Sequence, residues 1–303
     1  MVGKFESLKM YKVILPLFIS FSVFYYGCNI EPGISPDNTS GTSNLKDTVM
    51  TNVNYGNHVR HKYDIYLPAG RNKNTPVIVM IHGGAWKAGQ KEDFNYYVQL
   101  IKNNWKNVAI VNINYRLASL KDKIHHEAMM EDIKSAISDV ISKSSNYNIS
   151  TTRFGMIGAS AGGQLAMIYA YNHNDHKNIK CVGNIFGPSL IRDWDWYNST
   201  NLWVGAKMGD VLTEYVGKSW DTTAYAKVSP MLTVKTSSQP TIIFHGSLDP
   251  VVPVYQSQWM HGKLNTLKVA NEYHEYLAFH SFDNNQSDEV IKKMVTFFKK
   301  YLQ

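Results

Sequence analysis

The sequence has few cysteines, few charged residues and no apolar run long enough to span a membrane. Its two cysteines, Cys28 and Cys181, allow one bridge at most, which excludes a disulfide scaffold. Charged residues make up 18% of the chain, the formal net charge is +7 and no basic run occurs, so the composition argues against nucleic-acid binding. With 303 residues, 44% of them hydrophobic, the chain can bury a sizeable core, which excludes a disordered or collagen-like protein.

The longest apolar run lies near the N-terminus and is typical of an export signal. Three lysines precede the apolar residues 13–24, and a basic segment followed by a short apolar one is the pattern of a secretory signal. Twelve residues of helix cover about 18 Å, which is too short for a hydrocarbon core of about 30 Å. We therefore expect residues 1–27 to be a signal peptide and not a permanent transmembrane helix.

The apolar run ends in Tyr25-Tyr26-Gly27-Cys28, which resembles the lipobox of bacterial lipoproteins, with Tyr25 where that motif usually has Leu. The resemblance implies cleavage before Cys28 and a lipid on this cysteine. The protein would then be exported and anchored to a bacterial membrane, at the outer membrane or the periplasmic face. The alternative is an ordinary signal peptide followed by a free thiol. Residues 28–47 are rich in small and polar residues and are predicted to form a flexible tether.

From residue 48 to residue 303 the chain alternates between predicted strands and helices. Short apolar or alternating runs predict strands, and apolar residues at helical spacing predict helices. The predicted strands are 59–67, 77–81, 108–113, 154–157, 182–186, 241–244 and 269–276. The predicted helices are 94–104, 124–141, 161–171 and 288–301. This alternation predicts one α/β domain with a mostly parallel sheet, helices on both faces and ligands at the carboxyl ends of the strands.

A glycine-rich segment between a predicted strand and a predicted helix contains a candidate nucleophile. Residues 158–162, Gly-Ala-Ser-Ala-Gly, fit the G-x-S-x-G pattern with Ser160 at its centre. A strand before the motif and a helix after it are the setting of a nucleophile elbow, whose tight turn requires tiny residues beside the serine. The alternative is a glycine-rich helix start that packs on its sheet.

Two residues further along the chain complete the set that a nucleophilic serine needs. A serine hydroxyl is a weak nucleophile, so it requires a base that is oriented by an acid. Asp249 lies on the turn after the predicted strand 241–244, and His280 lies in the loop before the last helix. The order Ser160, Asp249, His280 is the one expected for α/β-hydrolases. The competing histidines stand before the acid or within predicted elements; they are His245, His261 and His274.

The loop after the predicted strand 77–81 is suited to bind an oxyanion. Residues 82–86 read His-Gly-Gly-Ala-Trp, and two consecutive glycines let a backbone turn its N–H groups into a site. Acyl transfer needs such donors where negative charge develops on the carbonyl oxygen. Taken alone, the segment would also fit a plain glycine turn.

Together these motifs resemble the α/β-hydrolase superfamily, specifically the small esterases related to hormone-sensitive lipase that include bacterial acetyl xylan and feruloyl esterases. The matching segments are residues 63–68, 82–86, 114–117, 158–163, 229–230, 245–249 and 252–253, together with His280. The resemblance implies the α/β-hydrolase fold, no cofactor, and oxyanion donors at the N–H groups of Gly84, Ala85 and Ala161. Ala85 stands where many relatives have a third glycine. Trp86 is similar to the HGG-x-W loop of arylformamidases, which keeps that activity open.

The sequence therefore predicts an exported serine carboxylesterase, with Ser160 as nucleophile, His280 as base and Asp249 as the acid that orients it. The expected substrates are acetyl or feruloyl esters on a plant polysaccharide or oligosaccharide. The alternatives are an arylformamidase or peptidase with the same triad and, outside the enzymes, an inactive surface binding module.

Other features of the sequence bear on how substrate is bound. A possible cap over residues 191–226 contains Trp194 and Trp196, whose rings could stack on a sugar or a phenolic acyl group or could simply pack. Together with Trp86 they are the candidate substrate-binding residues. Three histidine pairs lack an evident acidic or thiol partner, so we expect no metal. The sequence does not define the oligomeric state.

Overall fold

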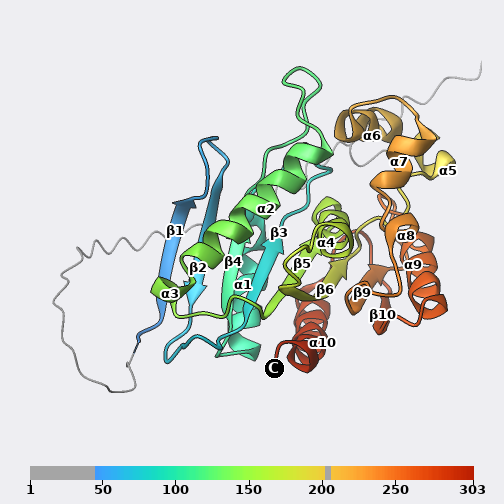
Figure 1. Ribbon diagram of the computed structural model, residues 1–303. Coiled ribbons are helices and arrows are strands. Elements are labelled where there is room, and N and C mark those ends of the chain that lie inside the picture. Colours follow the sequence, from blue (N-terminus) through green and yellow to red (C-terminus); the bar gives the residue numbers. More distant parts are fainter. Residues whose placement is uncertain (1–44, 202–205) are drawn as a thin grey trace, which may run out of the picture. The chain divides into compact units, whose positions relative to one another are not determined.

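The computed structural model describes residues 45–201 and 206–303 (Figure 1). The predicted signal peptide 1–27, the predicted lipid site Cys28 and the predicted tether up to residue 44 lie outside the described residues. The main strands are β1 (Thr48–Asn54), β2 (Lys62–Leu67), β3 (Val77–Ile81), β4 (Ala109–Ile113), β5 (Phe154–Ala159), β6 (Ile179–Ile185), β9 (Thr241–Gly246) and β10 (Asn271–Tyr276). The helices that cover them include α1 (Asn95–Asn104), α2 (His126–Ser142), α3 (Ser144–Tyr147), α4 (Ala161–Asn172), α8 (Pro230–Thr233), α9 (Tyr255–Thr266) and α10 (Asn284–Tyr301).

These eight strands form one sheet in the order β1-β2-β4-β3-β5-β6-β9-β10. β2 is antiparallel to both β1 and β4, and the other neighbours are parallel. The predicted α/β class with a mostly parallel sheet is thus confirmed. The sequence analysis missed β1, because this edge strand has mostly exposed side chains and so lacks an apolar alternation.

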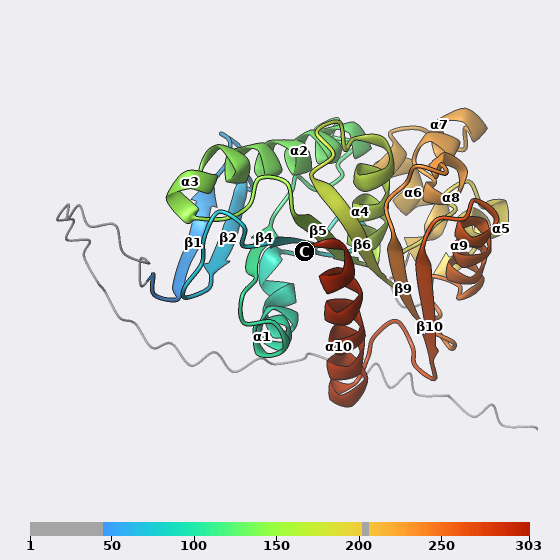
Figure 2. The same ribbon diagram turned by 60° about the horizontal axis from the view of Figure 1, so that its bottom comes forward.

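Both faces of the sheet are covered by helices, as Figure 2 shows: α2, α3 and α4 lie on one face, and α1 and α10 lie on the other. Strand β3 is fully buried, and its side chains alternate between two apolar clusters. Val77, Val79 and Ile81 belong to the cluster that contains α2 and α4, whereas Ile78 and Met80 join α1 and α10. A strand buried on both faces is apolar throughout, which is why this strand was found with correct bounds.

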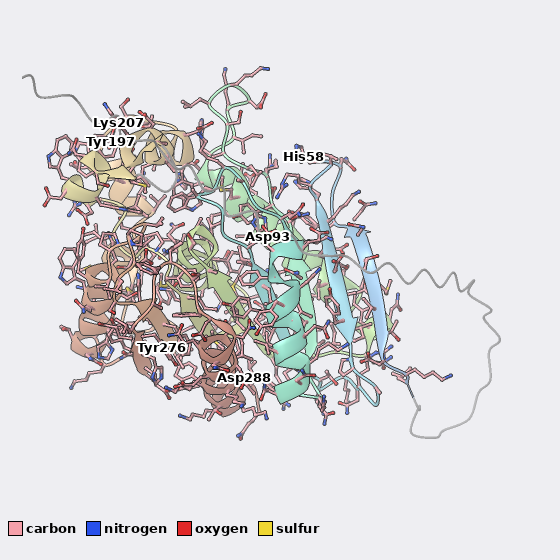
Figure 3. The ribbon with its side chains drawn as sticks, turned by 180° about the vertical axis from the view of Figure 1, so that it is seen from behind. His58, Asp93, Tyr197, Lys207, Tyr276 and Asp288 are labelled. Atoms are coloured by element: carbon pink, nitrogen blue, oxygen red, sulfur yellow. The ribbon has the colours of Figure 1, made fainter. Side chains whose placement is uncertain are left out.

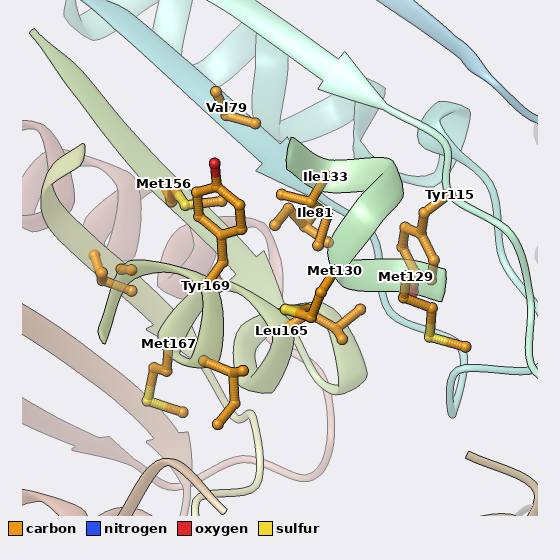
Figure 4. Packing of buried hydrophobic residues seen from close by; sticks show 14 of the residues in the cluster. Val79, Ile81, Tyr115, Met129, Met130, Ile133, Met156, Leu165, Met167 and Tyr169 are labelled. Atoms are coloured by element: carbon orange, nitrogen blue, oxygen red, sulfur yellow. The ribbon is translucent and has the colours of Figure 1, made fainter. Parts of the chain in front are cut away.

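The close-up in Figure 4 shows how α2 and α4 pack on the sheet. Ile133 of α2 and Leu165 of α4 lie near Ile81 at the carboxyl end of β3, and Tyr169 of α4 lies beside Met156 of β5. This packing holds α4 against β3 and β5, and so supports the turn between β5 and α4 that carries Ser160.

The described part of the predicted cap 191–226, which leaves out residues 202–205, forms several short elements: α5 (Trp194–Asn198), β7 (Thr200–Asn201), β8 (Ala206–Lys207), α6 (Met208–Val216) and α7 (Thr222–Lys227). Tyr197 and Lys207 mark this segment in Figure 3. Buried residues of α6, among them Leu212 and Tyr215, belong to the same apolar cluster as α4. The segment is thus packed on the main domain. Among the described residues no helix is long and apolar enough to cross a membrane.

Candidate active site

Ser160 stands on a sharp turn between β5 and α4. Its backbone has φ 53° and ψ −126°, a conformation that costs a residue other than glycine about 1–3 kcal/mol. A Cβ on Gly158 would collide with the backbone of Gly162, and a Cβ on Gly162 would collide with the carbonyl of Ile81. The two glycines of the motif are therefore required by the close approach of the elbow to its surroundings.

The structure brings Ser160, Asp249 and His280 into one hydrogen-bonded chain. Nε2 of His280 lies 2.9 Å from Oγ of Ser160, and Nδ1 lies 2.6 Å from Oδ2 of Asp249. A carboxylate beside Nδ1 fixes the proton on that nitrogen, which leaves the lone pair of Nε2 for the serine hydroxyl. The serine, the acid and the histidine follow the parallel strands β5, β9 and β10, whose carboxyl ends share one edge of the sheet.

The Asp249 carboxylate is buried and fully engaged. Its Oδ1 accepts the N–H groups of Val251 and Val252 at 2.8 and 3.0 Å, and its Oδ2 faces both His280 and His245. Burial acts to raise the pKa of Asp249, but the hydrogen bonds from His245, His280 and the Val252 N–H outweigh it and hold the pKa well below its ordinary value. Asp249 therefore carries its negative charge throughout the neutral and mildly acidic range.

The loop of residues 82–86 lies against the nucleophile in a strained conformation. Gly84, Ala85 and Trp86 have φ values of 108°, 50° and 61°. A Cβ on Gly83 would lie 2.9 Å from the Ala159 carbonyl and 3.1 Å from Cβ of Ser160, so this loop and the elbow are in close contact.

The three predicted oxyanion donors are available. In the described part of the chain the N–H groups of Gly84, Ala85 and Ala161 have no acceptor. Ala161 also opens α4, where the helix dipole favours an anion. The methyl group of Ala85 is thus compatible with a positive φ and with a free donor.

Arg60 and His82 support this loop through hydrogen bonds to its backbone and to the residues that follow it. Nδ1 of the buried His82 lies 2.7 Å from the Gly83 carbonyl, and its Nε2 lies 3.2 Å from the Arg60 guanidinium, which also donates to the Gly89 carbonyl at 2.8 Å. Burial lowers the pKa of His82 to about 4, so the ring is neutral at pH 7 and donates from Nδ1. No pattern in the sequence pointed to Arg60, which is separated from the loop by the two strands β2 and β3.

Gln164 joins three parts of the site. Its Oε1 accepts the indole N–H of Trp86 and the hydroxyl of Tyr215, both at 3.0 Å, and its Nε2 donates to the Val228 carbonyl at 2.7 Å. The rings of Trp86 and Tyr215 are stacked with their centres 4.3 Å apart. The helix of the nucleophile, the oxyanion loop and α6 are thereby linked. One signal could have suggested this residue: it is polar in an otherwise apolar helix.

A small apolar pocket opens beside Ser160. Its volume is about 20 Å³, which is room for one or two water molecules. Its lining residues are Ala85, Trp86, Ser160, Ala161, Pro188, Trp196, Met208, Val211, Val251 and Val252. An acyl group bound to Ser160 therefore meets a short apolar wall.

The three tryptophans singled out in the sequence have different surroundings. Trp86 and Trp196 are buried and line the pocket, and the indole N–H of Trp196 donates to the Val251 carbonyl at 3.0 Å. Trp194 is 53% exposed and lies outside the pocket lining, stacked on Tyr197 and edge-on to Trp220. Of these three tryptophans, Trp194 is the one that exposes its ring to solvent.

No group of three or more histidine, cysteine, aspartate or glutamate side chains within the described ranges could hold a metal ion. The buried Cys181 is free, and burial raises the pKa of its thiol well above the ordinary value. A thiol in that state is a poor nucleophile and a poor metal ligand.

The doubly covered, mostly parallel sheet, the strained serine turn and the Ser–His–Asp chain at its carboxyl edge define an α/β-hydrolase. The chain belongs to the BD-FAE family, whose model matches residues 63–264.

Individual relatives are distant. The chain is 25% identical over 228 residues to esterase LipQ of Mycobacterium tuberculosis, which covers 70% of this chain and 51% of LipQ. It is 27% identical over 130 residues to kynurenine formamidase of Danio rerio, covering 42% of this chain and 41% of that protein. A solved structure, a truncated form of a carbohydrate esterase from gut microbiota, has a TM-score of 0.68 and 22% identity and covers 85% of this chain and 97% of its own. The chain spans about half the length of the curated relatives it matches.

Proposed function

We propose that the protein is a serine carboxylesterase that removes small acyl groups, acetyl above all, from a plant polysaccharide or oligosaccharide. The single observation that carries the catalytic part is the position of His280, which lies within hydrogen-bond distance of both Ser160 and Asp249. This arrangement activates a hydroxyl for attack on a carbonyl. Membership of the BD-FAE family and the similarity to an esterase support the same reaction.

The proposed reaction uses each of these groups in turn. Oγ of Ser160 attacks the ester carbonyl while Nε2 of His280 takes the hydroxyl proton, and Asp249 stabilises the resulting imidazolium. The N–H groups of Gly84, Ala85 and Ala161 would bind the negative oxygen of the tetrahedral intermediate; each such donor is typically worth about 3 kcal/mol. The intermediate collapses to an acyl-enzyme when the alcohol leaves with the proton of His280. A water molecule, deprotonated by His280, then releases the acid and frees Ser160.

The pocket favours acetyl over feruloyl as the acyl group. Its volume of about 20 Å³ admits a methyl group, whereas the ring of a hydroxycinnamate would require its lining side chains to move. Trp194, with an exposed and well-supported ring, supports a carbohydrate alcohol because sugar rings stack on such surfaces.

A second candidate, hydrolysis of an N-formyl arylamine, is favoured by two observations. The chain resembles kynurenine formamidase, and a formyl group is smaller still than acetyl. The same triad could serve both reactions, but an amine is a poorer leaving group than an alcohol and depends more on the proton returned by His280.

Two measurements test the proposal. Ser160→Ala lowers esterase activity on p-nitrophenyl acetate at least 10³-fold, because no acyl-enzyme can form, while Ser142→Ala on α2, whose hydroxyl only bonds the Asp139 carbonyl, retains it. Residual activity of Ser160→Ala within tenfold of the wild type would refute the assignment of the nucleophile, whereas a wild type that hydrolyses no ester at all would favour the binding module. A panel of acetylated xylan, methyl ferulate and N-formylkynurenine then separates the substrates. Hydrolysis of N-formylkynurenine without hydrolysis of acetylated xylan would establish the second candidate.

We also propose, from the sequence alone, that the catalytic domain is exported and held at a bacterial membrane by a lipid on Cys28. Residues 28–47 would then keep the domain close to the membrane surface without embedding it. Such anchoring suits the capture of oligosaccharides at the cell surface.

A further inference from the structure

A second histidine lies on the buried carboxylate of the triad. His245, in β9, is completely buried, and its Nε2 lies 3.1 Å from Oδ2 of Asp249 and 2.9 Å from the Val252 carbonyl oxygen. On the other side of the ring, Nδ1 lies 2.6 Å from Oγ of Ser257 in α9. His280 and His245 therefore share one carboxylate oxygen.

The neighbours of His245 determine where its proton lies. Both atoms facing Nε2 are acceptors, so Nε2 carries a hydrogen and shares it between the carbonyl and the carboxylate. On the other side, Nδ1 is hydrogen-bonded to the Ser257 hydroxyl. The ring is thus held from both sides, with Nε2 donating to the acid of the triad.

This contact completes the set of donors around Asp249. Oδ1 is held by two backbone N–H groups, whereas Oδ2, the oxygen that faces the base, depends on two imidazoles. His280 gains and loses a proton in the proposed reaction, because it contacts Ser160, whereas His245 is bonded to Ser257 and the Val252 carbonyl. A fixed donor on Oδ2 keeps the oxygen directed and takes up part of its negative charge.

We propose that His245 is a positioning residue, which orients Oδ2 of Asp249 toward Nδ1 of His280 and moderates the charge that the carboxylate presents to the imidazolium. The inference rests on the proposed function, because it assigns His245 to the same catalytic chain.

Few other ionisable groups face this cluster. Glu275 of β10 is the register partner of His245, and its carboxylate accepts hydrogen bonds from Tyr273 at 2.5 Å and Gln258 at 3.1 Å. From α9 the hydroxyl of Ser257 contacts the ring. The ionisable groups around His245 are therefore Asp249, which it shares with His280, and the more distant Glu275.

Two polar substitutions separate positioning from simple packing. The amide nitrogen of glutamine can lie near the place of Nε2, so His245→Gln keeps a donor for Asp249. The shorter amide of asparagine lies near the place of Nδ1, so His245→Asn keeps a partner for Ser257 and leaves Oδ2 with one donor. His274→Asn is the matched control, since His274 lies on β10 and stacks on Phe244.

The expected result is a difference in the pH profile of kcat/KM for p-nitrophenyl acetate. With one donor fewer, the carboxylate stabilises the protonated His280 more strongly, so in His245→Asn the acid limb moves upward by roughly 0.5–1 pH unit and the plateau falls about tenfold. In His245→Gln the limb stays within about 0.2 pH unit of the wild type and most of the plateau is recovered. His274→Asn leaves the limb in place.

An acid limb in His245→Asn that coincides with the wild type, or that moves equally in His245→Gln, would overturn the proposal. If His245→Asn does not fold, the comparison of His245→Gln with His245→Leu replaces it, with the same limb as readout, and urea unfolding reports the stability of each. Failure of the proposed function would look different: Ser160→Ala would then retain activity whatever His245 does.

Discussion

Met208 is the side chain whose removal should change the selectivity of the acyl pocket. It is a buried residue at the start of α6 and lines the pocket beside Ser160. Met208→Ala deletes three heavy atoms from a cavity of only about 20 Å³, so the pocket becomes long enough for a larger acyl chain.

The magnitude follows from the extra apolar surface that the enlarged pocket can bury. Butyrate has two methylenes more than acetate, and each buried methylene is worth about 0.8 kcal/mol. Full burial of both therefore raises the ratio of kcat/KM for butyrate over acetate by about 1.6 kcal/mol, or roughly 15-fold. Partial collapse of the cavity would reduce this gain but not reverse it.

The assay compares p-nitrophenyl butyrate with p-nitrophenyl acetate in the wild type and in two variants. Leu212→Ala is the matched control, because Leu212 lies on the same helix, is fully buried and is absent from the pocket lining. Both variants lose stability through a core cavity, but only Met208→Ala should change the chain-length ratio. An unchanged ratio in Met208→Ala, or an equal change in Leu212→Ala, would refute the assignment of this pocket to the acyl group.

Three other predictions concern stability, substrate binding and location. Burial lowers the pKa of His82 to about 4, whereas an unfolded histidine titrates near 6.5. Between these two pH values the unfolded chain binds a proton that the folded chain does not. The free energy of unfolding therefore falls by up to about 3 kcal/mol as the pH drops from 6.5 to 4. Urea unfolding at pH 7.5 and pH 5 measures this slope; His82→Gln should flatten it, and an unchanged slope contradicts the prediction. Trp194→Ala should raise KM for an acetylated xylo-oligosaccharide and spare p-nitrophenyl acetate, whereas equal losses on both would indicate a packing role. Cys28→Ser should release active enzyme from the membrane fraction of the expressing bacterium, and wild-type protein that is already fully soluble would rule out the lipid.

Sequence reasoning was most successful where a local pattern and a local structure coincide. The buried strand Val77–Ile81 is uniformly apolar, and the elbow around Ser160 needs glycines at fixed places, so both could be predicted from a few residues. The triad could be predicted because Asp249 and His280 come shortly after strands that the apolar pattern had already indicated.

What the sequence analysis missed depends on contacts between distant segments. Arg60 lies 22 residues before His82 and Gln164 lies 78 residues after Trp86, and no spacing rule connects either pair. The short helices of residues 194–227 have too few turns to establish a periodicity, so only their folded packing reveals them. His245 was considered only as a rival base, because the sequence places it near Asp249 without showing which way its ring faces.

The backbone of Ser160 has a consequence for attempts to make this protein more heat-resistant. Glycine adopts φ 53° and ψ −126° without the steric strain that serine has there, so replacing the nucleophile by glycine relieves about 1–3 kcal/mol of conformational strain. A screen that ranks variants by melting temperature alone would therefore reward loss of the reactive hydroxyl. Selection for thermal stability has to be coupled at every round to a measurement of turnover, because at this residue a gain in stability costs catalytic activity.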